Sequence, residues 1–471
     1  MTAIVSQSDA LDTDTIVAVT TANGRGGVGI VRLSGPDASR IGALIAGELP
    51  APREAVFATF RNADGAPIDN GLALRFQGPA SFTGEDVVEL QGHGSPVALQ
   101  MLVKVAVGAG ARPARAGEFS ERAYLNGKLD LAQAEAVADL INADSEAMAE
   151  AALRSLRGEF SKLVHSMMAA LTALRVQVEA AIDFPDEDIE LLNEPSIRYA
   201  LSGLLDEVAH LRKRAREGVL LNEGIKLVLL GAPNVGKSSV LNRLCGSERA
   251  IVTEVPGTTR DLLRERIHLK GMPVDLIDTA GLRTSDDVIE QEGIRRAESA
   301  ALEADLIIAV FDATDEHSRS FISRRLDRLQ SNDRSGSKSP LKALVVGNKI
   351  DLLSQPIVRD AFAGATFAGA TLVSAKSNEG FKELTERLVD ILGVSGDQAR
   401  GVFSARTRHL LALEAAGESL MDAQQGIKQN IGAELVAEHL RLAQNELGSV
   451  CGELTSDALL GEIFSSFCIG K

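Results

Sequence analysis

Short apolar runs separated by glycine-rich turns occupy the first 120 residues of the chain. Four runs have the length and composition of β-strands, namely residues 16–19, 29–33, 72–76 and 87–90. Residues 97–107 have a helical pattern instead. We therefore expect a compact α+β domain over residues 1–120.

Two turns in this domain invite a functional interpretation. The first, Asn23-Gly24-Arg25-Gly26-Gly27-Val28-Gly29, is glycine-rich like a dinucleotide-binding loop, but a strand follows it rather than a helix, which disfavours that function. The second places His93 between two glycines. This histidine is either a catalytic group or a turn residue that makes local hydrogen bonds, and the sequence leaves both open.

The pattern changes to alanine-rich helix between residues 118 and 183. Apolar positions recur there at steps of three or four, which predicts one stripe along a long helix: Leu153, Leu156, Phe160, Leu163, Met167, Leu171, Leu174 and Val178. Phe184-Pro185 interrupts this pattern. A second helical stripe follows, made of Leu201, Leu204, Val208 and Leu211.

A helical segment returns near the C-terminus, between residues 405 and 448. We expect one face of it to carry Leu435, Leu440, Ala443 and Leu447. Because a lone segment would leave this face exposed, we expect it to pack on the helices of residues 120–220. The sequence thus predicts a discontinuous α-helical bundle domain, residues 121–222 and 393–471, with another domain inserted at 223–392.

The inserted segment carries a phosphate-binding loop directly after the apolar run 227–230. Its residues fit the pattern G-x-x-x-x-G-K-[ST] at every fixed position, and a helical stretch follows. Glycines permit the tight turn that lets backbone N–H groups surround a phosphate, and the helix N-terminus adds a favourable dipole. Lys237 can reach the outer phosphates, and the Ser238 hydroxyl can bind Mg²⁺. The predicted nucleotide contacts are Asn234, Val235, Gly236, Lys237, Ser238 and Ser239.

Further motifs follow in the order that a GTPase requires. Asp278-Thr279-Ala280-Gly281 places a carboxylate near Mg²⁺ and a glycine amide near the terminal phosphate. The aspartate of Asn348-Lys349-Ile350-Asp351 accepts two N–H groups of guanine, whereas adenine would leave it partly unpaired, so the nucleotide is predicted to be GTP. Ser374-Ala375-Lys376 is the expected loop beneath the base. The segment is therefore predicted to be a Ras-like α/β P-loop GTPase domain.

Composition narrows the cellular setting. The net charge of −16 argues against broad, non-specific nucleic-acid binding, so any RNA contact should be local or shared with a partner. Three cysteines, Cys245, Cys451 and Cys468, are too few and too scattered for a disulfide framework or a four-ligand zinc site. No apolar run reaches the roughly 18 residues of a membrane span, and the first 14 residues lack a basic signal segment, so we expect a cytoplasmic protein without a membrane partner.

These motifs and several other segments resemble the MnmE (TrmE) family of tRNA-modification GTPases over essentially the whole chain. Besides the P-loop, the resemblance is carried by Gly26-Gly27-Val28-Gly29-Ile30, Phe82-Thr83-Gly84-Glu85-Asp86, Glu89-Leu90-Gln91-Gly92-His93-Gly94, Gly117-Glu118-Phe119-Ser120-Glu121-Arg122-Ala123, residues 128–136, residues 250–261 and Phe464-Ser465-Ser466-Phe467-Cys468-Ile469-Gly470-Lys471.

The resemblance implies one-carbon chemistry on tRNA. The N-terminal domain of the family dimerises and binds 5-formyl- or 5,10-methylene-tetrahydrofolate, and the matching positions are Arg32, Glu89, Lys128 and Lys471. Without the resemblance these would be ordinary surface charges and a strand-end carboxylate. Together with an FAD-dependent GidA/MnmG-type protein, in a heterotetramer, the family adds an aminomethyl or carboxymethylaminomethyl group to C5 of the wobble uridine of certain tRNAs.

Cys468 has two interpretations. A thiolate that adds to C6 of uracil would activate C5, so Cys468 could be the nucleophile. Alternatively the terminal motif is a docked tail that positions Lys471 beside the folate, and the partner supplies the nucleophile. The sequence leaves both open.

The GTPase lacks the usual catalytic glutamine, because Leu282 stands where Ras-like switches carry it. Asp286, Asp287, Glu290 and Glu292 are acidic candidates to orient the water, and the resemblance assigns this role to Glu290. The resemblance also implies that K⁺ replaces an arginine finger when two GTPase domains dimerise. The matching K⁺ ligands are Asn234, Thr253, Val255 and Thr258, and Thr259 would join Ser238 on Mg²⁺. Asn234 could instead only stabilise its turn.

Two other functions compete with tRNA modification. A regulatory GTPase of ribosome assembly would share the nucleotide motifs, but it would carry a basic RNA-binding appendage rather than the folate-type domain and the terminal motif. A folate-dependent transferase with an inactive GTPase domain is disfavoured because every nucleotide motif is intact.

Overall fold

The computed structural model describes residues 14–183, 194–247, 264–269, 272–278, 304–332, 342–353, 367, 369–392, 402–429, 432–453 and 456–470. The chain forms two compact units. The first comprises Met1–Ala138, Ser155–Val208 and Ala412–Lys471, and the second comprises Asp139–Arg154 and Ala209–Leu411. We describe each unit by itself.

A six-stranded sheet with the order β3-β4-β5-β2-β1-β6 forms the N-terminal part of the first unit. Its strands are β1 (Ile16–Val19), β2 (Gly26–Ser34), β3 (Ala55–Arg61), β4 (Pro67–Phe76), β5 (Val87–Gly94) and β6 (Arg112–Pro113). Neighbouring strands are antiparallel except β1 and β6. The four predicted strands are confirmed as β1, β2, β4 and β5, whereas β3 and β6 were not predicted.

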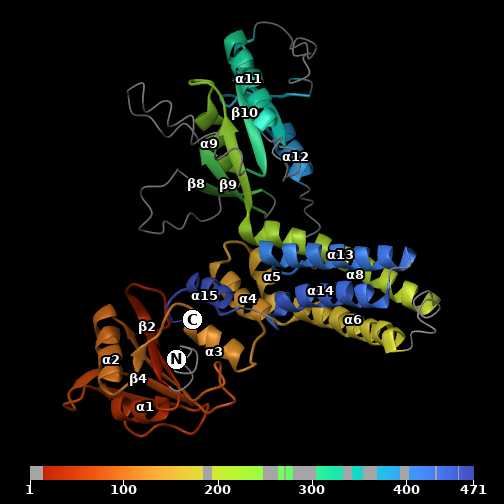
Figure 1. Cartoon of the computed structure of the whole chain (residues 1–471). Helices are drawn as coiled ribbons and strands as arrows, with labels where there is room; N and C mark the ends of the chain where they lie inside the picture. Colours follow the sequence, from red (N-terminus) through yellow and green to blue (C-terminus); the bar gives the residue numbers. More distant parts are fainter. Residues whose placement is uncertain are drawn as a thin grey trace, which may run out of the picture. The chain divides into compact units, whose positions relative to one another are not determined.

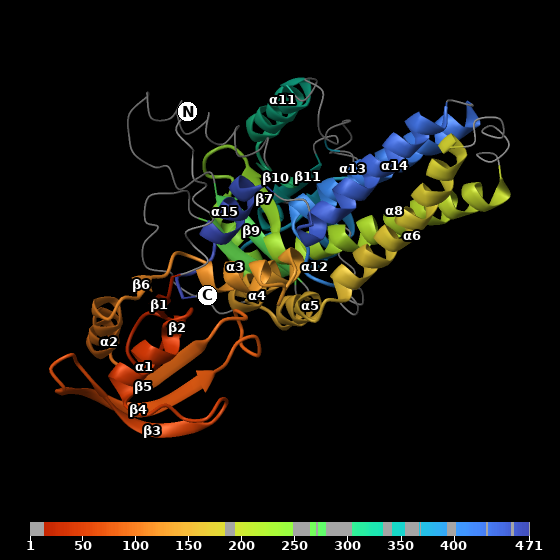
Figure 2. The ribbon, with the colours of Figure 1, turned by 60° about the horizontal axis from the view of Figure 1, so that its bottom comes forward.

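Two helices, α1 (Ala38–Ala46) and α2 (Pro96–Gly108), cover one face of this sheet (Figure 2). The predicted helix 97–107 is therefore confirmed. Val31, Leu33 and Leu90 point into the core under the helices. Because side chains alternate along a strand, Arg32 and Glu89 lie on the opposite face, where β2 and β5 pair them directly. The register of the sheet thus brings two charged residues together away from its apolar core.

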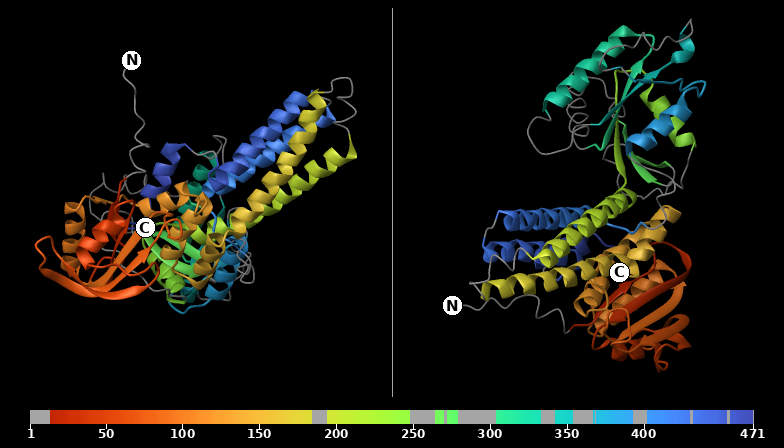
Figure 3. Two further views of the ribbon diagram at one scale, coloured as in Figure 1. Left: turned by 90° about the horizontal axis from the view of Figure 1, so that it is seen from below. Right: turned by 90° about the vertical axis from the view of Figure 1, so that its right-hand side faces the viewer.

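The helical part of the first unit is built around α6 (Glu159–Asp183) and α14 (Ala433–Cys451), which lie side by side (Figures 1 and 3). Gln444 of α14 accepts a hydrogen bond from Arg175 of α6 at 2.7 Å and donates one to Thr172 at 3.1 Å. Helices α8 (Pro195–Glu223) and α13 (Thr407–Lys428) also contribute to this part. The expected packing of the C-terminal helices on the earlier ones is confirmed.

The predicted long helix through residues 153–178 is wrong, because the chain breaks at Gly158 between α5 (Glu146–Leu156) and α6. Gly158 has a φ of 78°, which is left-handed and ends a helix readily. At the end of α5, the side chain of Gln133 donates a hydrogen bond to the Leu156 carbonyl at 3.1 Å. Apolar periodicity runs through the break and therefore does not reveal it.

The predicted apolar face of the last helix also needs a correction. Leu440, Ala443 and Leu447 are buried as predicted, but Leu435 is 57% exposed. Val436 is buried in its place. Steps of four, three and four residues connect positions 436, 440, 443 and 447, so Leu435 lies about 100° off the stripe. The second predicted stripe, Leu201 to Leu211, is buried throughout.

The second unit contains a six-stranded sheet with the order β12-β11-β10-β7-β9-β8. Its strands are β7 (Ile225–Leu230), β8 (Arg264–Leu269), β9 (Met272–Asp278), β10 (Leu306–Asp312), β11 (Ala343–Asn348) and β12 (Thr371–Leu372). All neighbours are parallel except β8 and β9. Such a parallel sheet, with helices between its strands, is the predicted Ras-like α/β fold.

Helices cover both faces of this sheet. Leu306, Ile308 and Val310 of β10 pack with α9 (Lys237–Ser247) and α12 (Phe381–Leu392). The alternate residues, Ala309 and Phe311, pack with α11 (Glu316–Asn332). Burial on both faces explains why β10 is apolar at every position up to Phe311.

The two ends of the segment that carries this sheet are tied together. Glu223, two residues before β7, accepts hydrogen bonds from the backbone N–H and the hydroxyl of Thr407, both at 2.8 Å. Thr407 begins α13. A short connection between the entry and the exit of the segment is what an inserted domain requires, and the boundary 223–392 stays a prediction. Among the described residues, no helix combines the length and the apolarity needed to cross a bilayer.

Candidate functional site

The predicted nucleotide motifs meet at one edge of the second sheet. The carboxyl ends of parallel strands lie at the same edge, so the residues after β7, β9, β10, β11 and β12 come together. Within the described residues these are the P-loop, Asp278 at the end of β9, and the loops that start at Asp312, Asn348 and Val373. This edge is the candidate GTP site.

The P-loop curls around the head group of its own lysine. Lys237 Nζ donates to the carbonyls of Gly231 at 2.8 Å and Ala232 at 3.0 Å, and the residue is buried. Gly236 has a φ of 93°, and a Cβ there would overlap the side chain of Asn348. Because α9 begins at Lys237, the loop presents the helix N-terminus with a positive charge at its centre. This arrangement fits a polyphosphate.

Asn348 connects the P-loop to the loop beneath the base. Its Nδ2 donates to the Val235 carbonyl at 2.9 Å, and its Oδ1 accepts from the Ala375 backbone N–H at 3.1 Å. The side chain is only 2% exposed. One buried amide therefore fixes three motifs that are far apart in the sequence.

Lys349 forms a second connection between these loops. Its Nζ donates to the Asn234 carbonyl at 2.8 Å and lies 2.7 Å from Asp312 Oδ2. Burial by itself raises the pKa of Asp312, but hydrogen bonds from Lys349 and Thr314 outweigh it, so the pKa of this carboxyl lies below its ordinary value. Asp312 therefore stays charged at neutral pH and holds the lysine against the P-loop.

Asp351 is positioned by the loop that follows β12. Ser374 Oγ donates to Asp351 Oδ1 at 2.6 Å and itself accepts from the Ser377 backbone N–H at 3.1 Å. Asp351 is exposed. A carboxylate fixed on one oxygen at the open edge can accept the adjacent N–H groups of a guanine.

Arg243 was not identified from the sequence. It lies on α9 and donates to the carbonyls of Ala375 at 3.2 Å and Lys376 at 3.1 Å. It therefore attaches the loop beneath the base to the helix that follows the P-loop. Its partners are backbone carbonyls, which leave no signal in a residue pattern.

The structure places some predicted GTP-site residues and not others. Asn234, with a φ of 63°, lies in the P-loop, and Ser238 and Ser239 lie in the first turn of α9. The positive φ favours the interpretation of Asn234 as a turn residue, and it leaves the K⁺ role a prediction. Thr253, Val255, Thr258, Thr259, Thr279, Ala280, Gly281 and Glu290 lie outside the described residues.

The described residues offer few acidic side chains as ligands for Mg²⁺. They contain no cluster of three or more His, Cys, Asp or Glu side chains that could hold a metal. Ser238, in the first turn of α9, offers a hydroxyl group to Mg²⁺, and nucleotide phosphates and water commonly supply further ligands of this ion.

A second candidate site lies on the face of the N-terminal sheet opposite α1 and α2. Arg32 Nε donates to Glu89 Oε1 at 2.9 Å, and Arg32 Nη2 lies 2.7 Å from the same oxygen. The guanidinium carbon lies 5.6 Å from the ring centre of Phe82 and 5.7 Å from that of Phe119. Phe119 is fully buried, whereas Phe82 is 38% exposed, so the Phe82 ring and the ion pair form a surface that suits a flat, polar heterocycle.

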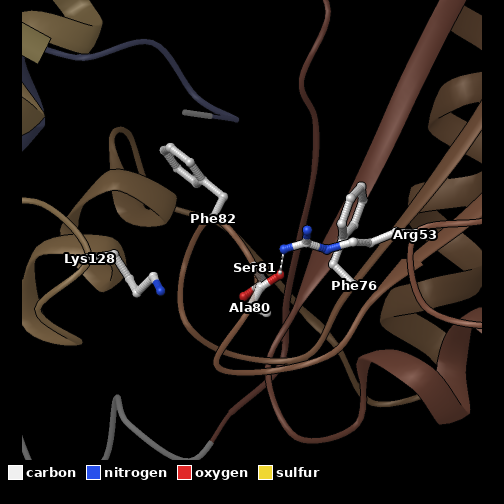
Figure 4. Close-up of a pocket in the computed structure, with 6 residues that line it drawn as sticks. All are labelled: Arg53, Phe76, Ala80, Ser81, Phe82 and Lys128. Carbon is white, nitrogen blue, oxygen red and sulfur yellow. Dashed lines mark hydrogen bonds between the residues drawn. The ribbon is translucent and has the colours of Figure 1, made fainter. Parts of the chain in front are cut away.

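Lys128, the third predicted folate residue, lines a pocket of about 440 Å³ beside this surface. Its Nζ donates to the Pro79 carbonyl at 2.9 Å. Figure 4 shows the pocket, whose other lining residues are Arg53, Phe76, Ala80, Ser81 and Phe82. Phe82 belongs to both the pocket and the Arg32 surface, so the structure brings Arg32, Glu89 and Lys128 into one region. Lys471 lies outside the described residues.

The C-terminal tail follows α15 (Asp457–Ser465) and is docked on the N-terminal domain. Ile469 forms a β-bridge with Ala116, and the Gly117 N–H donates to the Cys468 carbonyl at 3.4 Å. Gly470 has a φ of 94°, and a Cβ there would overlap the Val19 carbonyl. Cys468 is exposed. The tail therefore lies close to the Arg32 surface, since Gly117 is two residues from Phe119.

A buried ionic cluster holds α3 (Glu118–Leu125), the helix that carries Phe119. Glu118, 1% exposed, accepts hydrogen bonds from Arg112 at 2.6 and 3.1 Å and from Arg122 at 3.3 Å. Burial by itself raises the pKa of Glu118, but hydrogen bonds from Arg112 and the Arg115 backbone outweigh it, so this pKa lies below its ordinary value. Glu118, Arg112 and Arg122 are visible as charged residues in the sequence, but nothing in the sequence indicates that they form one cluster.

His93 makes hydrogen bonds to a residue of the neighbouring strand β4. Its backbone N–H donates to Asp69 Oδ2 at 2.7 Å, and its Nδ1 lies 2.7 Å from Asp69 Oδ1. The ring is 72% exposed. His93 therefore lies in β5 and bonds across to β4, so the interpretation as a turn residue with local hydrogen bonds is wrong.

Comparisons with known proteins cover the whole described architecture. Residues 15–128 match the sequence model described as GTP-binding protein TrmE N-terminus, and residues 131–468 match the MnmE helical domain. The tRNA modification GTPase MnmE of Aeromonas hydrophila subsp. hydrophila is 49% identical over 98% of this chain and 100% of its own. The protein of the same name from Vibrio cholerae serotype O1 is 46% identical over the same shares.

Two of the solved structures that this chain resembles are G domains of FeoB proteins. The FeoB G domain from Methanococcus jannaschii is 22% identical, covers 36% of this chain and 97% of its own, and gives a TM-score of 0.26.

Proposed function

Because the chain belongs to the MnmE (TrmE) family of tRNA modification GTPases, we propose that it hydrolyses GTP and couples hydrolysis to the modification of a tRNA wobble uridine. The observation that carries this proposal is the extent of the relatedness. Relatives named tRNA modification GTPase match 98% of this chain, including the N-terminal domain and the C-terminal tail that a ribosome-assembly GTPase would not need.

In the GTP site each described residue has a role. The amides of residues 234–239 and Lys237 bind the phosphates, and Asp351, held by Ser374, selects guanine. Asn348 and Lys349, which follow β11, hold the P-loop in place through hydrogen bonds to its carbonyl groups. Thr253, Thr258, Asp278, Thr279, Ala280, Gly281, Ala375 and Lys376 complete the proposed nucleotide contacts, with Ser238 and Thr259 on Mg²⁺.

Hydrolysis in this proposal does not use a glutamine. Glu290 orients the attacking water, since Leu282 cannot. K⁺, held by Asn234 with Thr253, Val255 and Thr258, would supply the positive charge that an arginine finger supplies elsewhere. This geometry arises when two GTPase domains meet, so the proposal includes a homodimer.

The N-terminal domain binds the one-carbon donor. Glu89 accepts N–H groups of a pterin, and Arg32, Lys128 and Lys471 contribute positive charge around it. A bound methylene-tetrahydrofolate would supply the carbon that is attached to C5 of the uridine. The docked tail brings the exposed Cys468 to the same region, where its thiolate could add to C6 of the base.

We place this reaction in the cytoplasm and in a complex with an FAD-dependent GidA/MnmG-type protein. The flavin belongs to that partner. The net charge of −16 supports binding of tRNA by the complex rather than by this chain alone, because a chain with this charge repels a polyanion.

The test is a measurement of modified nucleosides. The gene is deleted, or replaced by a Lys237→Ala form, and wobble nucleosides in digested tRNA are measured by mass spectrometry. Loss of C5-aminomethyl-type uridines in both strains is expected, because Lys237 lies at the centre of the P-loop. Lys226→Ala, at an exposed position in β7, is the matched control and should leave the nucleosides unchanged.

Two outcomes would change the conclusion. Unchanged nucleosides in the deletion strain would rule out the modification role and favour a GTPase of ribosome assembly. Loss in the deletion strain alone would show that GTP hydrolysis regulates the modification but is not required for it.

A further inference from the structure

The pocket beside the Arg32 surface contains two cations that face it from different elements. Arg53 follows α1 and Lys128 follows α3, and Figure 4 shows their side chains pointing toward the same turn from opposite sides. Arg53 Nη2 donates to the Ala80 carbonyl at 3.2 Å, and Lys128 Nζ donates to the Pro79 carbonyl at 2.9 Å. One backbone turn thus holds both head groups in the pocket.

Neither cation has an acidic partner within the part of the chain that the structure describes. The lining contains no carboxylate, and its remaining side chains are Phe76, Ala80, Ser81 and Phe82. In a chain with a net charge of −16, two neighbouring cations without an acid are unusual. Their charges are available to an anionic ligand, and a volume of about 440 Å³ is that of a small-molecule site.

The backbone at Arg53 is held in an unfavourable conformation. Its φ is 69°, which is rare for a residue other than glycine or asparagine. A hydrogen bond from its backbone N–H to the Arg75 carbonyl, at 2.7 Å, fixes this conformation. The strained loop places the guanidinium in the pocket, and such strain is concentrated at sites that bind ligands.

The pocket is continuous with the proposed pterin surface through Phe82. One side of this ring faces the pocket, and its centre lies 5.6 Å from the Arg32 guanidinium carbon. A ligand that lies on the Arg32 and Glu89 pair can therefore extend along Phe82 and end between Arg53 and Lys128. Such a ligand has a flat polar head, an aromatic middle and an acidic end.

We propose that Arg53, together with Lys128, binds the carboxylates of the glutamyl tail of the folate, and that this pocket makes the protein prefer folates with several glutamyl residues. The inference rests on the proposed folate function and adds Arg53 as a residue that determines specificity. A guanidinium binds a carboxylate through two parallel hydrogen bonds, which makes Arg53 the stronger of the two anchors.

The test is a calorimetric titration of the full-length protein with three probes. They are 5-formyltetrahydropteroate, which has no tail, and 5-formyltetrahydrofolate with one or with three glutamyl residues. Wild-type protein should bind the triglutamate most tightly. Arg53→Gln should weaken binding of both glutamylated probes by about 10-fold and leave the tail-less probe within about 2-fold. Arg53→Lys should restore part of the loss, because it keeps the charge.

Arg61 provides the matched control. It ends β3, the strand that follows Arg53, and also donates to a single backbone carbonyl, that of Gly65 at 3.0 Å, but it does not line the pocket. Arg61→Gln should leave all three affinities unchanged. If Arg53→Gln does not fold, Arg53→Gly removes the cation and accepts the positive φ, so the comparison can still be made.

The outcomes distinguish the two proposals. If wild-type protein binds none of the probes, the folate function itself fails and this inference falls with it. Suppose that wild-type protein binds the probes. If Arg53→Gln binds all three as tightly as wild type, or binds all three more weakly by the same factor, the tail pocket is wrong while the folate function stands. If Arg53→Gln weakens binding of tRNA but of no folate, the pocket holds a phosphate, which also overturns the inference.

Discussion

Single polar side chains that contact backbone groups of other loops hold the nucleotide site together. Asn348 uses both ends of its amide, one on Val235 and one on Ala375, and Arg243 and Lys349 each bind carbonyls of another motif. At this scale the site is a set of loops with little regular structure of their own, so its shape depends on a few side chains.

Asn348→Asp tests this dependence. The substitution keeps the size of the side chain but removes the donor to the Val235 carbonyl and leaves two acceptors facing each other in a buried place. We expect the affinity for GDP and GTP to fall by about 10- to 100-fold, which is the loss expected for one buried hydrogen bond and an unpaired acceptor.

A fluorescent guanine nucleotide measures the effect of Asn348→Asp. Lys382→Gln, on the exposed side of α12, is the control and should bind like wild type. Wild-type affinity in Asn348→Asp would mean that the loops hold their positions without this amide.

Whole elements depend on charge as well as on apolar packing. Helix α3 is anchored by Glu118, which lies among Arg112, Arg115 and Arg122. Glu121 of the same helix bonds to Arg115 at 2.8 Å, but burial raises its pKa above the ordinary value. Two glutamates three residues apart thus contribute to stability in opposite ways.

Glu118→Gln should loosen α3 at neutral pH, and Glu121→Gln should not. The folded-state pKa of Glu118 is lowered, so its stabilisation is fully present above its ordinary value of 4.5 and is lost as the pH falls through the folded pKa. Glu121 has a raised pKa, so its charged form is disfavoured in the folded state. Its replacement by glutamine therefore costs little stability at pH 7.

Hydrogen exchange of peptides that cover α3 measures this difference. Breaking a buried ion pair costs about 3 kcal/mol, so exchange in Glu118→Gln should be roughly 100-fold faster at pH 7 and should approach the wild-type rate only as the pH falls below 4.5 and through the lowered folded-state pKa of Glu118. A difference that stays constant across this pH range would show that the charge of Glu118 is not what holds the helix.

The sequence predicted the elements better than their junctions. Apolar spacing identified the strands around Arg32 and the stripe through Leu440, because burial imposes a period. It missed the break at Gly158 and misplaced Leu435, because apolar residues continue past a helix end and lie on exposed faces too. Nucleotide motifs were recognisable because phosphate and guanine demand fixed residue types. Arg53 and Arg243 were not, because they contact backbone carbonyls that only the fold brings near.

At the scale of the whole molecule, each compact unit is assembled from distant parts of the chain. The first unit pairs α6 with α14 and receives the C-terminal tail. In the second unit, Glu223 and Thr407 bring the two ends of the sheet-bearing segment together. A GTPase segment whose two ends are tied together can contact a second copy of the chain without any change in the fold of the first unit. The proposed K⁺ site depends on such a second copy.

The GTP hydrolysis rate in KCl and in NaCl at equal ionic strength tests the dimeric K⁺ site. We expect faster hydrolysis in KCl, with a rate that rises more than linearly with protein concentration. Asn234→Gly should abolish the salt preference and keep nucleotide binding, because glycine accepts the φ of 63° and lacks the side-chain oxygen. Equal rates in the two salts for the wild type would remove K⁺ from the mechanism.

The docked tail has a consequence for how the protein is made. Gly470 lies against the Val19 carbonyl, so residues that are synthesised late complete a surface that β1 begins. A chain emerges from its N-terminus and its early domains fold first, yet this domain waits for more than 400 further residues before its tail arrives. A product of premature termination can therefore carry an intact P-loop and still lack Cys468. Only a chain that is translated through Gly470 brings β1 and the tail together.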